Sequence, residues 1–278
     1  MLGRASLNAL IARGHSVVAL PRAELDLLDP AAVTVAVERE LPDVVLNCAA
    51  WTDVDGAEAD EDGAMRLNDQ AAAVLAAAAD AVGASIVHPS SDYVFDGRKP
   101  EPYVETDLPA PLSAYGRSKL AGETSVSVAN ERHLIVRSSW LFGSGGPNFV
   151  ETMLRIGSEE QEAIVANDQI GLPTYTPHLA GGIAELIEAE QTGIFHVAAS
   201  GPCSWYDFAQ EIFDQAGLEC RVMAGTTSML ARPAPRPPYS VLGTKHRGVP
   251  VLPHWREGLA SYLFEREGSE AHGGEAAA

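Results

Sequence analysis

The stretch Ser85-Ile86-Val87-His88-Pro89-Ser90-Ser91-Asp92 indicates the fold, because a short apolar run ends there in serine and aspartate side chains. Residues 85–88 have the length and β-branched content of a buried strand. An alanine-rich helical pattern over residues 68–81 precedes this strand, and another over residues 114–129 follows it. Strands that alternate with helices in this way predict an α/β fold with a parallel sheet.

The same alternation extends in both directions along the chain. Towards the N-terminus the sequence predicts strands at residues 16–20 and 44–47, and Gly14 ends the helix before the first of them. A helix over residues 30–41 lies between these two strands. Beyond Trp140 the pattern is less regular. There we expect strands at residues 164–166 and 194–198, and helices at residues 149–156, 178–190, 206–216 and 255–266. A further strand is predicted before Trp140, at residues 134–137.

These elements predict a Rossmann-like, doubly wound parallel sheet that lacks its first strand, together with a smaller C-terminal substrate-binding domain. Residues 1–145 and 163–200 would form the nucleotide-binding domain, and residues 146–162 and 201–266 the smaller one. The proline-rich segment 231–238 suits neither a helix interior nor a central strand. Residues 267–278 are predicted to be a disordered tail.

Composition narrows the classes of function. The 278 residues include 19 basic and 38 acidic side chains, for a formal charge of −19, which opposes general attraction to nucleic acid or anionic membrane. No apolar run approaches the length of a membrane span and no signal pattern is present, so we expect a cytoplasmic protein.

Cys48, Cys203 and Cys220 suit neither a disulfide framework nor a zinc site and are expected to be buried thiols. The histidines show no metal-binding spacing, so we expect no metal.

The beginning of the chain carries a separate expectation. A dinucleotide-binding fold opens with a strand, a glycine-rich turn and a helix whose N-terminus faces the pyrophosphate. This chain starts Met1-Leu2-Gly3-Arg4 and enters an amphipathic helix at once. We therefore expect Met1 to be an internal methionine of the natural protein, with Leu2 and Gly3 at the cofactor. Gly3 as an incidental flexible residue is the alternative.

Tyr115 and Lys119 are the first candidates for catalysis. They lie four positions apart in a predicted helix, so the phenol and the ammonium share one face. An adjacent cation favours phenolate, and we expect Lys119 to lower the pKa of Tyr115 toward neutrality. A tyrosine packed on a lysine stem is the alternative, because this spacing also occurs by chance.

Ser91 is the third candidate, because it ends a predicted strand where ligands bind in open α/β sheets. Its hydroxyl would donate to a substrate carbonyl while Tyr115 delivers the proton. Lys119 would also bind the ribose of a nicotinamide cofactor. Serine, tyrosine and lysine in this order, with 24 positions from the first to the second, resemble the short-chain dehydrogenase/reductase superfamily.

Further segments suggest binding roles. The small residues Ala49 and Ala50, with Trp51, end another strand and would let a cofactor approach the backbone, although tight packing would also explain them. Arg22 follows the predicted strand at residues 16–20, at a place where an acidic residue would repel the 2′-phosphate of NADPH. Because an arginine stands there instead, we expect NADPH to serve at least as well as NADH. Arg232 and Arg236 would hold a substrate pyrophosphate, or else belong to a solvated loop.

Six segments together resemble the dTDP-4-dehydrorhamnose reductase family, extended members of that superfamily, and the likeness spans Met1 to about Leu263. They are residues 47–58, 90–97, 115–123, 137–143, 168–174 and 236–240. The resemblance implies reduction of the C4 ketone of dTDP-4-dehydro-6-deoxy-L-mannose to dTDP-L-rhamnose with NADPH or NADH.

The resemblance also implies roles for single residues. It places the proton donor on Tyr115, the lysine on Lys119 and the catalytic hydroxyl, commonly threonine in the family, on Ser91. It further implies sugar contacts at Ser91, Asp92 and Trp140, adenine contacts at Asp26 and Leu27, and a cofactor segment at Ala49, Ala50 and Trp51, where tyrosine is more usual than tryptophan.

Two other functions remain open at this point. A nucleotide-sugar epimerase or another sugar-nucleotide reductase would use the same serine, tyrosine and lysine, but an epimerase recycles its cofactor. A non-catalytic binding or regulatory homologue would bind the sugar nucleotide without turnover. The sequence leaves the oligomeric state open, a homodimer included.

Overall fold

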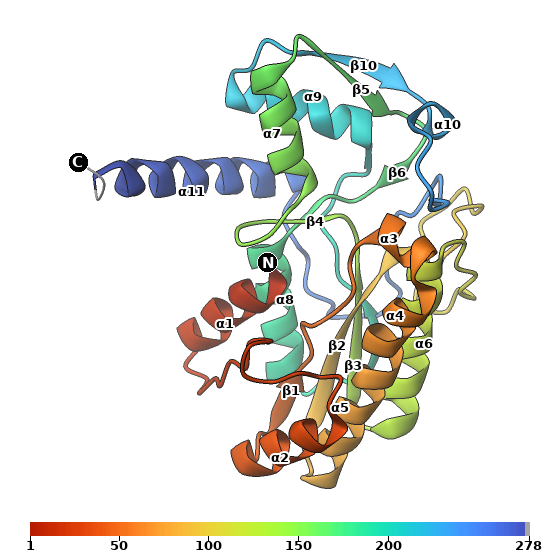
Figure 1. Cartoon of the computed structure of the whole chain (residues 1–278), viewed down its shortest axis with the longest axis vertical. Coiled ribbons are helices and arrows are strands. Elements are labelled where there is room, and N and C mark those ends of the chain that lie inside the picture. Colours follow the sequence, from red (N-terminus) through yellow and green to blue (C-terminus); the bar gives the residue numbers. More distant parts are fainter. Residues whose placement is uncertain (276–278) are drawn as a thin grey trace.

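The computed structural model describes the backbone of residues 1–275 and the side chains of residues 1–268. Its centre is a parallel sheet of four strands in the order β1-β2-β3-β8 (Figure 1). The predicted α/β fold with a parallel sheet is therefore confirmed. The strands are β1 (Val44–Leu46), β2 (Ser85–Ser91), β3 (His133–Ser138) and β8 (Gly193–His196).

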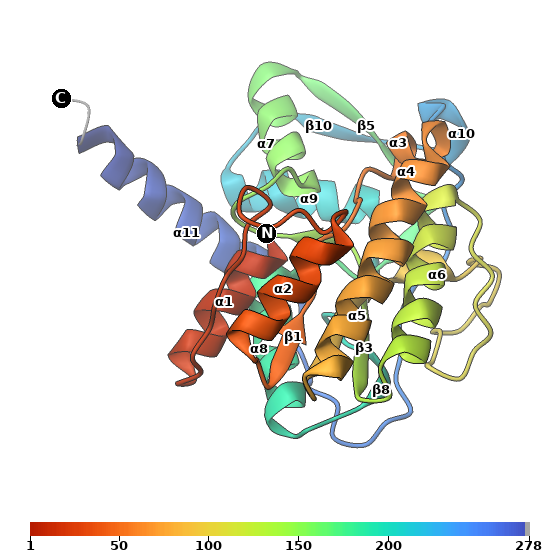
Figure 2. The ribbon, with the colours of Figure 1, turned by 60° about the horizontal axis from the view of Figure 1, so that its bottom comes forward.

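Helices cover both faces of this sheet (Figures 1 and 2). On one face α2 (Pro30–Glu40), α5 (Ala71–Ala81) and α6 (Ala114–Ala129) enclose an apolar cluster that includes Ile86. On the other face α1 (Leu2–Ala12) and α8 (Thr176–Glu188) enclose a cluster that includes Val87. Successive side chains of β2 thus enter opposite layers, as the alternation of a strand requires.

A smaller unit lies at one end of the molecule, above the sheet in Figure 1. Here β5 (Glu162–Ala166) and β10 (Arg221–Gly225) pair in parallel, and α7 (Phe149–Glu159) and α9 (Trp205–Ala216) pack beside them around Phe208 and Phe213. The sequence assigns residues 163–166 to the nucleotide-binding domain. Because β5 pairs with β10, that predicted boundary falls inside the small sheet.

The predicted strand at residues 16–20 is wrong. This segment pairs with no strand among residues 1–275, and Val18 is 58% exposed. A strand is stabilised by backbone hydrogen bonds from a neighbour, and an apolar pattern cannot tell whether that neighbour is present. Consequently β1 forms an edge of the sheet, and its three residues are only partly buried.

The C-terminal helix α11 (Trp255–Glu275) is longer than expected and extends away from the body (Figures 1 and 2). The sequence ends this helix at residue 266 and predicts disorder from residue 267. The expectation is wrong up to Glu275, because the helix continues through Gly268, Gly273 and Gly274 although glycine disfavours a helix interior. Residues 276–278 lie outside the described residues. None of the described helices is long and apolar enough to cross a membrane.

The remaining elements are short and mostly surround the carboxyl ends of the sheet strands. The short elements are α3 (Val54–Ala59), α4 (Glu61–Met65), the π-helical turn η1 (Arg66–Gln70), the 3-10 turn η2 (Asp92–Val94), α10 (Thr227–Leu230), β4 (Leu141–Phe142), β6 (Ile170–Gly171), β7 (Thr174–Tyr175) and β9 (Cys203–Ser204).

The expectation of three buried thiols needs correction, because Cys48 is exposed whereas Cys203 and Cys220 are buried.

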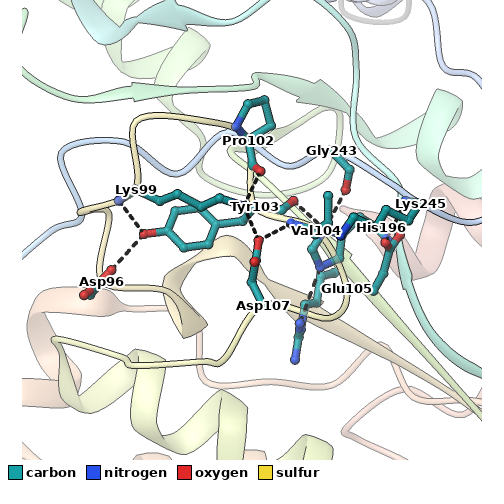
Figure 3. A network of polar contacts seen from close by, with 11 residues as sticks. Asp96, Lys99, Pro102, Tyr103, Val104, Glu105, Asp107, His196, Gly243 and Lys245 are labelled. Atoms are coloured by element: carbon teal, nitrogen blue, oxygen red, sulfur yellow. Dashed lines mark hydrogen bonds and ion pairs between the residues drawn. The ribbon is translucent and has the colours of Figure 1, made fainter.

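A polar network fastens the loop of residues 96–107 to the end of the sheet (Figure 3). Inside the loop, the Tyr103 hydroxyl donates to Asp96 at 2.7 Å. The Glu105 carboxylate accepts from the backbone N–H groups of His196 at 3.2 Å and Lys245 at 3.0 Å. His196 Nδ1 lies 3.0 Å from the carbonyl oxygen of Tyr103, and therefore carries the proton.

Arg137 Nη1 lies 3.4 Å from His196 Nε2, and this nitrogen can accept a hydrogen bond only in the neutral imidazole. Burial lowers the pKa of the His196 imidazole, and the neighbouring Arg137 guanidinium lowers it further, although Glu105 raises it. The unfolded chain therefore binds the proton more readily than the folded chain. The His196 contribution to stability is intact above the unfolded pKa of about 6.5 and is lost as the pH falls below it.

We expect the free energy of unfolding to fall below pH 6.5, by at most roughly 1.4 kcal/mol per pH unit from His196. Urea unfolding between pH 8 and pH 5 measures this slope. His196→Asn keeps an N–H near the Nδ1 position but does not titrate, so its slope should be smaller. Equal slopes in the two proteins would exclude His196 as a source. Buried His88, whose pKa is also lowered by burial, remains in both.

Candidate active site

Three predicted residues, Ser91, Tyr115 and Lys119, meet at the carboxyl end of β2. Ser91 ends that strand, and its side chain lies beside Tyr115, whose pKa it lowers. Ser113 caps α6 by accepting from the Gly116 N–H at 3.1 Å, which places Tyr115 in the first helical turn. Lys119 follows one turn later on the same helix.

Gly116 allows this close meeting of α6 with the sheet. A Cβ at this position would lie 2.3 Å from the carbonyl oxygen of Tyr93. The Tyr93 and Tyr115 rings then pack edge to face, with centroids 5.6 Å apart. A glycine directly after the tyrosine is therefore a packing requirement of the site.

The electrostatics of the site differ from the sequence-based expectation. Burial raises the pKa of Tyr115 to about 12, the hydrogen bond to Ser91 lowers it, and the Asp92 charge raises it. The prediction that Lys119 lowers this pKa is wrong, because the ammonium donates to the Pro89 carbonyl at 2.8 Å. Tyr115 is consequently a neutral phenol at pH 7, the form that can give up a proton.

Lys119 is itself only 3% exposed. Burial lowers its pKa to about 8, although Glu123 and Cys48 raise it. The ammonium form still predominates at neutral pH. Its remaining N–H donors are available to a hydroxyl-bearing ligand.

Asp92 lies next to Ser91 but is 1% exposed. Its carboxylate accepts from the hydroxyls of Ser91 at 3.1 Å, Ser139 at 3.2 Å and Ser240 at 2.5 Å. Burial raises its pKa to about 6, against the lowering effect of these hydrogen bonds. The structure therefore surrounds the predicted sugar contact with serines. Sequence reasoning missed Ser139 and Ser240, which lie far from Asp92 along the chain.

Trp140 directly follows Ser139 and has a backbone φ of 48°. Its indole stacks on that of Trp205, with ring centroids 3.6 Å apart and planes inclined by 5°. A Cβ on Gly171 would lie 2.4 Å from the Trp140 ring, so glycine is needed there. Trp205 also donates to Gln169 at 3.1 Å. Sequence reasoning missed Trp205, for which no local pattern exists.

The predicted cofactor segment follows β1. Ala49 is exposed and Ala50 is half-buried. The backbone N–H of Trp51 donates to Asn68 Oδ1 at 2.8 Å, and Asn68 donates back to the Trp51 carbonyl at 3.1 Å. Asn68 comes from the π-helical turn η1, and its role was not predicted.

The N-terminal residues reach the same edge of the sheet. A Cβ on Gly3 would lie 3.2 Å from the Cβ of Cys48, so the start of α1 meets the end of β1. Leu2 packs its side chain into the core against α8. Arg22 and Asp26 are exposed in the loop before α2, and Leu27 is half-buried against the core.

The two predicted pyrophosphate ligands differ in their surroundings. Arg232 is exposed. The guanidinium of Arg236 is 8% exposed and donates to both oxygens of Asp55, at 3.1 Å and 2.8 Å. Arg236 would have to leave Asp55 to bind an anion, whereas Arg232 would not. No group of three His, Cys, Asp or Glu side chains within the described part of the chain is arranged to hold a metal.

Comparisons with known proteins agree on one family. The family model described as "RmlD substrate binding domain" matches residues 1–267. The dTDP-4-dehydrorhamnose reductase of Streptomyces griseus is 44% identical over 269 residues, which cover 93% of this chain and 88% of that protein.

Two solved structures are also close. A crystal structure of a dTDP-4-dehydrorhamnose reductase from Clostridium acetobutylicum has a TM-score of 0.93 at 41% identity, covering 96% of both chains. A dTDP-4-dehydrorhamnose reductase from Bacillus anthracis in complex with NADP has a TM-score of 0.91 at 38% identity, covering 95% of both chains.

Proposed function

The chain belongs to the RmlD substrate-binding-domain family, and on this premise we propose that it reduces dTDP-4-dehydro-6-deoxy-L-mannose to dTDP-L-rhamnose with NAD(P)H. We assign the cofactor to the four-stranded sheet and the nucleotide sugar to the unit of α7, β5, α9 and β10. The relatives at about 40% identity support the reaction. The meeting of Ser91 and Tyr115 beside Lys119 carries the proposal.

The residues present suit a dinucleotide. The helix α1 has no side-chain cap at its N-terminus, so its first N–H groups can face an anion such as a pyrophosphate. Small side chains at the end of β1 leave room beside the backbone. The residues assigned to the cofactor are Leu2, Gly3, Arg22, Asp26, Leu27, Ala49, Ala50, Trp51, Tyr115 and Lys119.

The chemistry of the site follows from its protonation states. When bound, NAD(P)H supplies the hydride that the carbonyl carbon of the sugar takes up. Tyr115, a neutral phenol, gives its proton to the carbonyl oxygen as that oxygen becomes a hydroxyl. The Ser91 hydroxyl donates a hydrogen bond to the same oxygen and so stabilises the charge that develops there. Lys119 binds the ribose through the N–H donors that its hydrogen bond to Pro89 leaves available.

The purified chain, mixed with NADPH and the 4-keto sugar nucleotide, tests the proposal. We expect one NADPH to be oxidised for each dTDP-L-rhamnose formed. An epimerase would convert sugar without net oxidation, and a binding homologue would bind the sugar nucleotide with no turnover. Either result would refute the proposed reduction.

Arg22 predicts the cofactor preference. An exposed guanidinium can pair with a 2′-phosphate, and such charge-assisted contacts contribute roughly 1.5–3 kcal/mol. We expect NADPH to serve at least as well as NADH, and Arg22→Glu to lower kcat/KM for NADPH by roughly 10- to 100-fold with little change for NADH. Arg39→Glu, an exposed site on α2, is the matched control. A strong preference of the unmodified protein for NADH would contradict the role of Arg22.

We place the reaction in the cytoplasm. The three cysteines are free thiols, which a reducing compartment maintains.

The substrate's pyrophosphate is assigned to Arg232, and to Arg236 if it leaves Asp55. Trp140 is assigned to the sugar.

A further inference from the structure

Asp92 is a buried meeting point of segments that are far apart in the sequence. Ser91 comes from the end of β2, Ser139 from the turn after β3, and Ser240 from the chain that follows the proline-rich segment. All three hydroxyls donate to the one carboxylate. No cation is among the hydrogen-bonding partners of this carboxylate in the described part of the chain.

The two carboxylate oxygens have different partners. Oδ1 accepts from Ser91 at 3.1 Å, whereas Oδ2 accepts from Ser139 at 3.2 Å and from Ser240 at 2.5 Å. Ser139 is itself fixed, because its oxygen accepts from the Leu172 N–H at 3.3 Å. Ser139 and Ser240 therefore hold the carboxylate on one side, and the carboxylate holds the Ser91 hydroxyl on the other. Hydrogen bonds to a buried charge are strong and costly to remove.

We propose that Asp92 is a positioning residue that fixes the Ser91 hydroxyl beside Tyr115 and does not itself contact the sugar. The proposal rests on the proposed ketone reduction. Without a substrate the Ser91 proton points at Asp92, and the Tyr93 N–H donates to the Ser91 oxygen at 3.2 Å. When a carbonyl arrives, rotation about the Cβ–Oγ bond of Ser91 redirects the proton to it. That rotation breaks the hydrogen bond to Asp92, and the Tyr93 N–H continues to hold the oxygen.

Asp92→Asn tests this role with little change of shape. An amide has one acceptor oxygen and presents N–H donors, so it cannot accept from all three serines. We expect kcat to fall by roughly 10- to 100-fold, with KM for the sugar nucleotide changed by less than about threefold. A large rise in KM at unchanged kcat would instead indicate a direct sugar contact and would overturn the proposal.

The decisive measurement is a double-mutant cycle of Asp92→Asn with Ser91→Ala. If Asp92 acts through Ser91, its replacement changes kcat by less than about twofold once the hydroxyl is absent. If Asp92 is only structural, or acts elsewhere, the two effects multiply and the proposal fails. Circular dichroism and the unfolding midpoint establish that each variant is folded.

Ser240→Ala covers the case in which Asp92→Asn does not fold. It removes one donor and keeps the charge, so we expect kcat to fall by roughly three- to tenfold, again only when Ser91 is present. Ser261→Ala is the matched control, because that hydroxyl donates to the Glu257 carbonyl in an exposed hydrogen bond on α11. Equal kcat values for Ser240→Ala and the unmodified protein would contradict the proposal.

Failure of the proposed reaction is distinguishable from failure of this inference. An unmodified chain that oxidises no NADPH refutes the reaction. The same cycle measured by urea unfolding then decides whether Asp92 holds Ser91. Coupling of at least roughly fivefold in the unfolding equilibrium constant supports that contact, and effects that multiply independently refute it.

Discussion

The Tyr115→Phe variant is expected to lose ketone reduction almost completely while it still binds the sugar nucleotide. Removal of a positioned proton donor typically costs 100- to 10,000-fold in rate, and we expect kcat to fall by roughly that factor. Only the hydroxyl is deleted, so the ring can still pack edge to face on Tyr93. Initial rates of NADPH oxidation measure the loss, and titration calorimetry measures binding.

A matched control separates this effect from the general loss of a phenol. Tyr103 lies in the loop of residues 96–107, outside the assigned site, and Tyr103→Phe should leave kcat unchanged. If Tyr115→Phe turned over at the rate of the unmodified protein, Tyr115 would not be the proton donor. If it failed to bind the sugar nucleotide, the hydroxyl would be needed for binding.

The largest expected effect on stability comes from the buried ion pair between β3 and α6. Arg137 and Glu123 are 2% and 3% exposed and form two hydrogen bonds, at 2.8 Å and 2.6 Å. Arg137→Met removes the cation and leaves a buried, unpaired carboxylate. We expect the free energy of unfolding to fall by roughly 3–5 kcal/mol, a large part of the roughly 5–15 kcal/mol of an ordinary domain.

Two further proteins test the cause of that loss. In the double variant Arg137→Met with Glu123→Leu no charge is left unpaired, so much of the stability should return. Arg155→Met breaks an exposed i,i+4 pair with Glu159 on α7 and should cost no more than roughly 0.5 kcal/mol. Urea unfolding measures all of them. Similar losses for Arg137→Met and Arg155→Met would contradict the role of burial.

Much of the site is predictable because its residues lie at positions with local signals. Ser91 ends an apolar run, and Tyr115 and Lys119 are one helical turn apart. The Lys119 contact with Pro89 and the burial of Tyr115 depend on how α6 packs against β2, so spacing alone predicted the wrong sign of the Tyr115 pKa shift.

Other features have no local signal at all. Ser240 contacts Asp92 and Trp205 contacts Trp140 only through the tertiary fold of the C-terminal segments. The pattern at residues 16–20 has the composition of a strand, but composition does not reveal that residues 1–275 offer this segment no pairing partner. Strand order likewise depends on crossovers that single segments do not encode.

The hydrogen bond between Ser240 and Asp92 has a consequence for synthesis of the protein. The two residues are 148 positions apart, so a ribosome that adds 5–20 residues per second makes the second one roughly 7 to 30 seconds after the first. A nascent chain can form β2 and α6 during that interval, but its carboxylate still lacks one donor. Prematurely terminated products that end before Ser240 therefore cannot form all three hydrogen bonds from serine hydroxyls to Asp92.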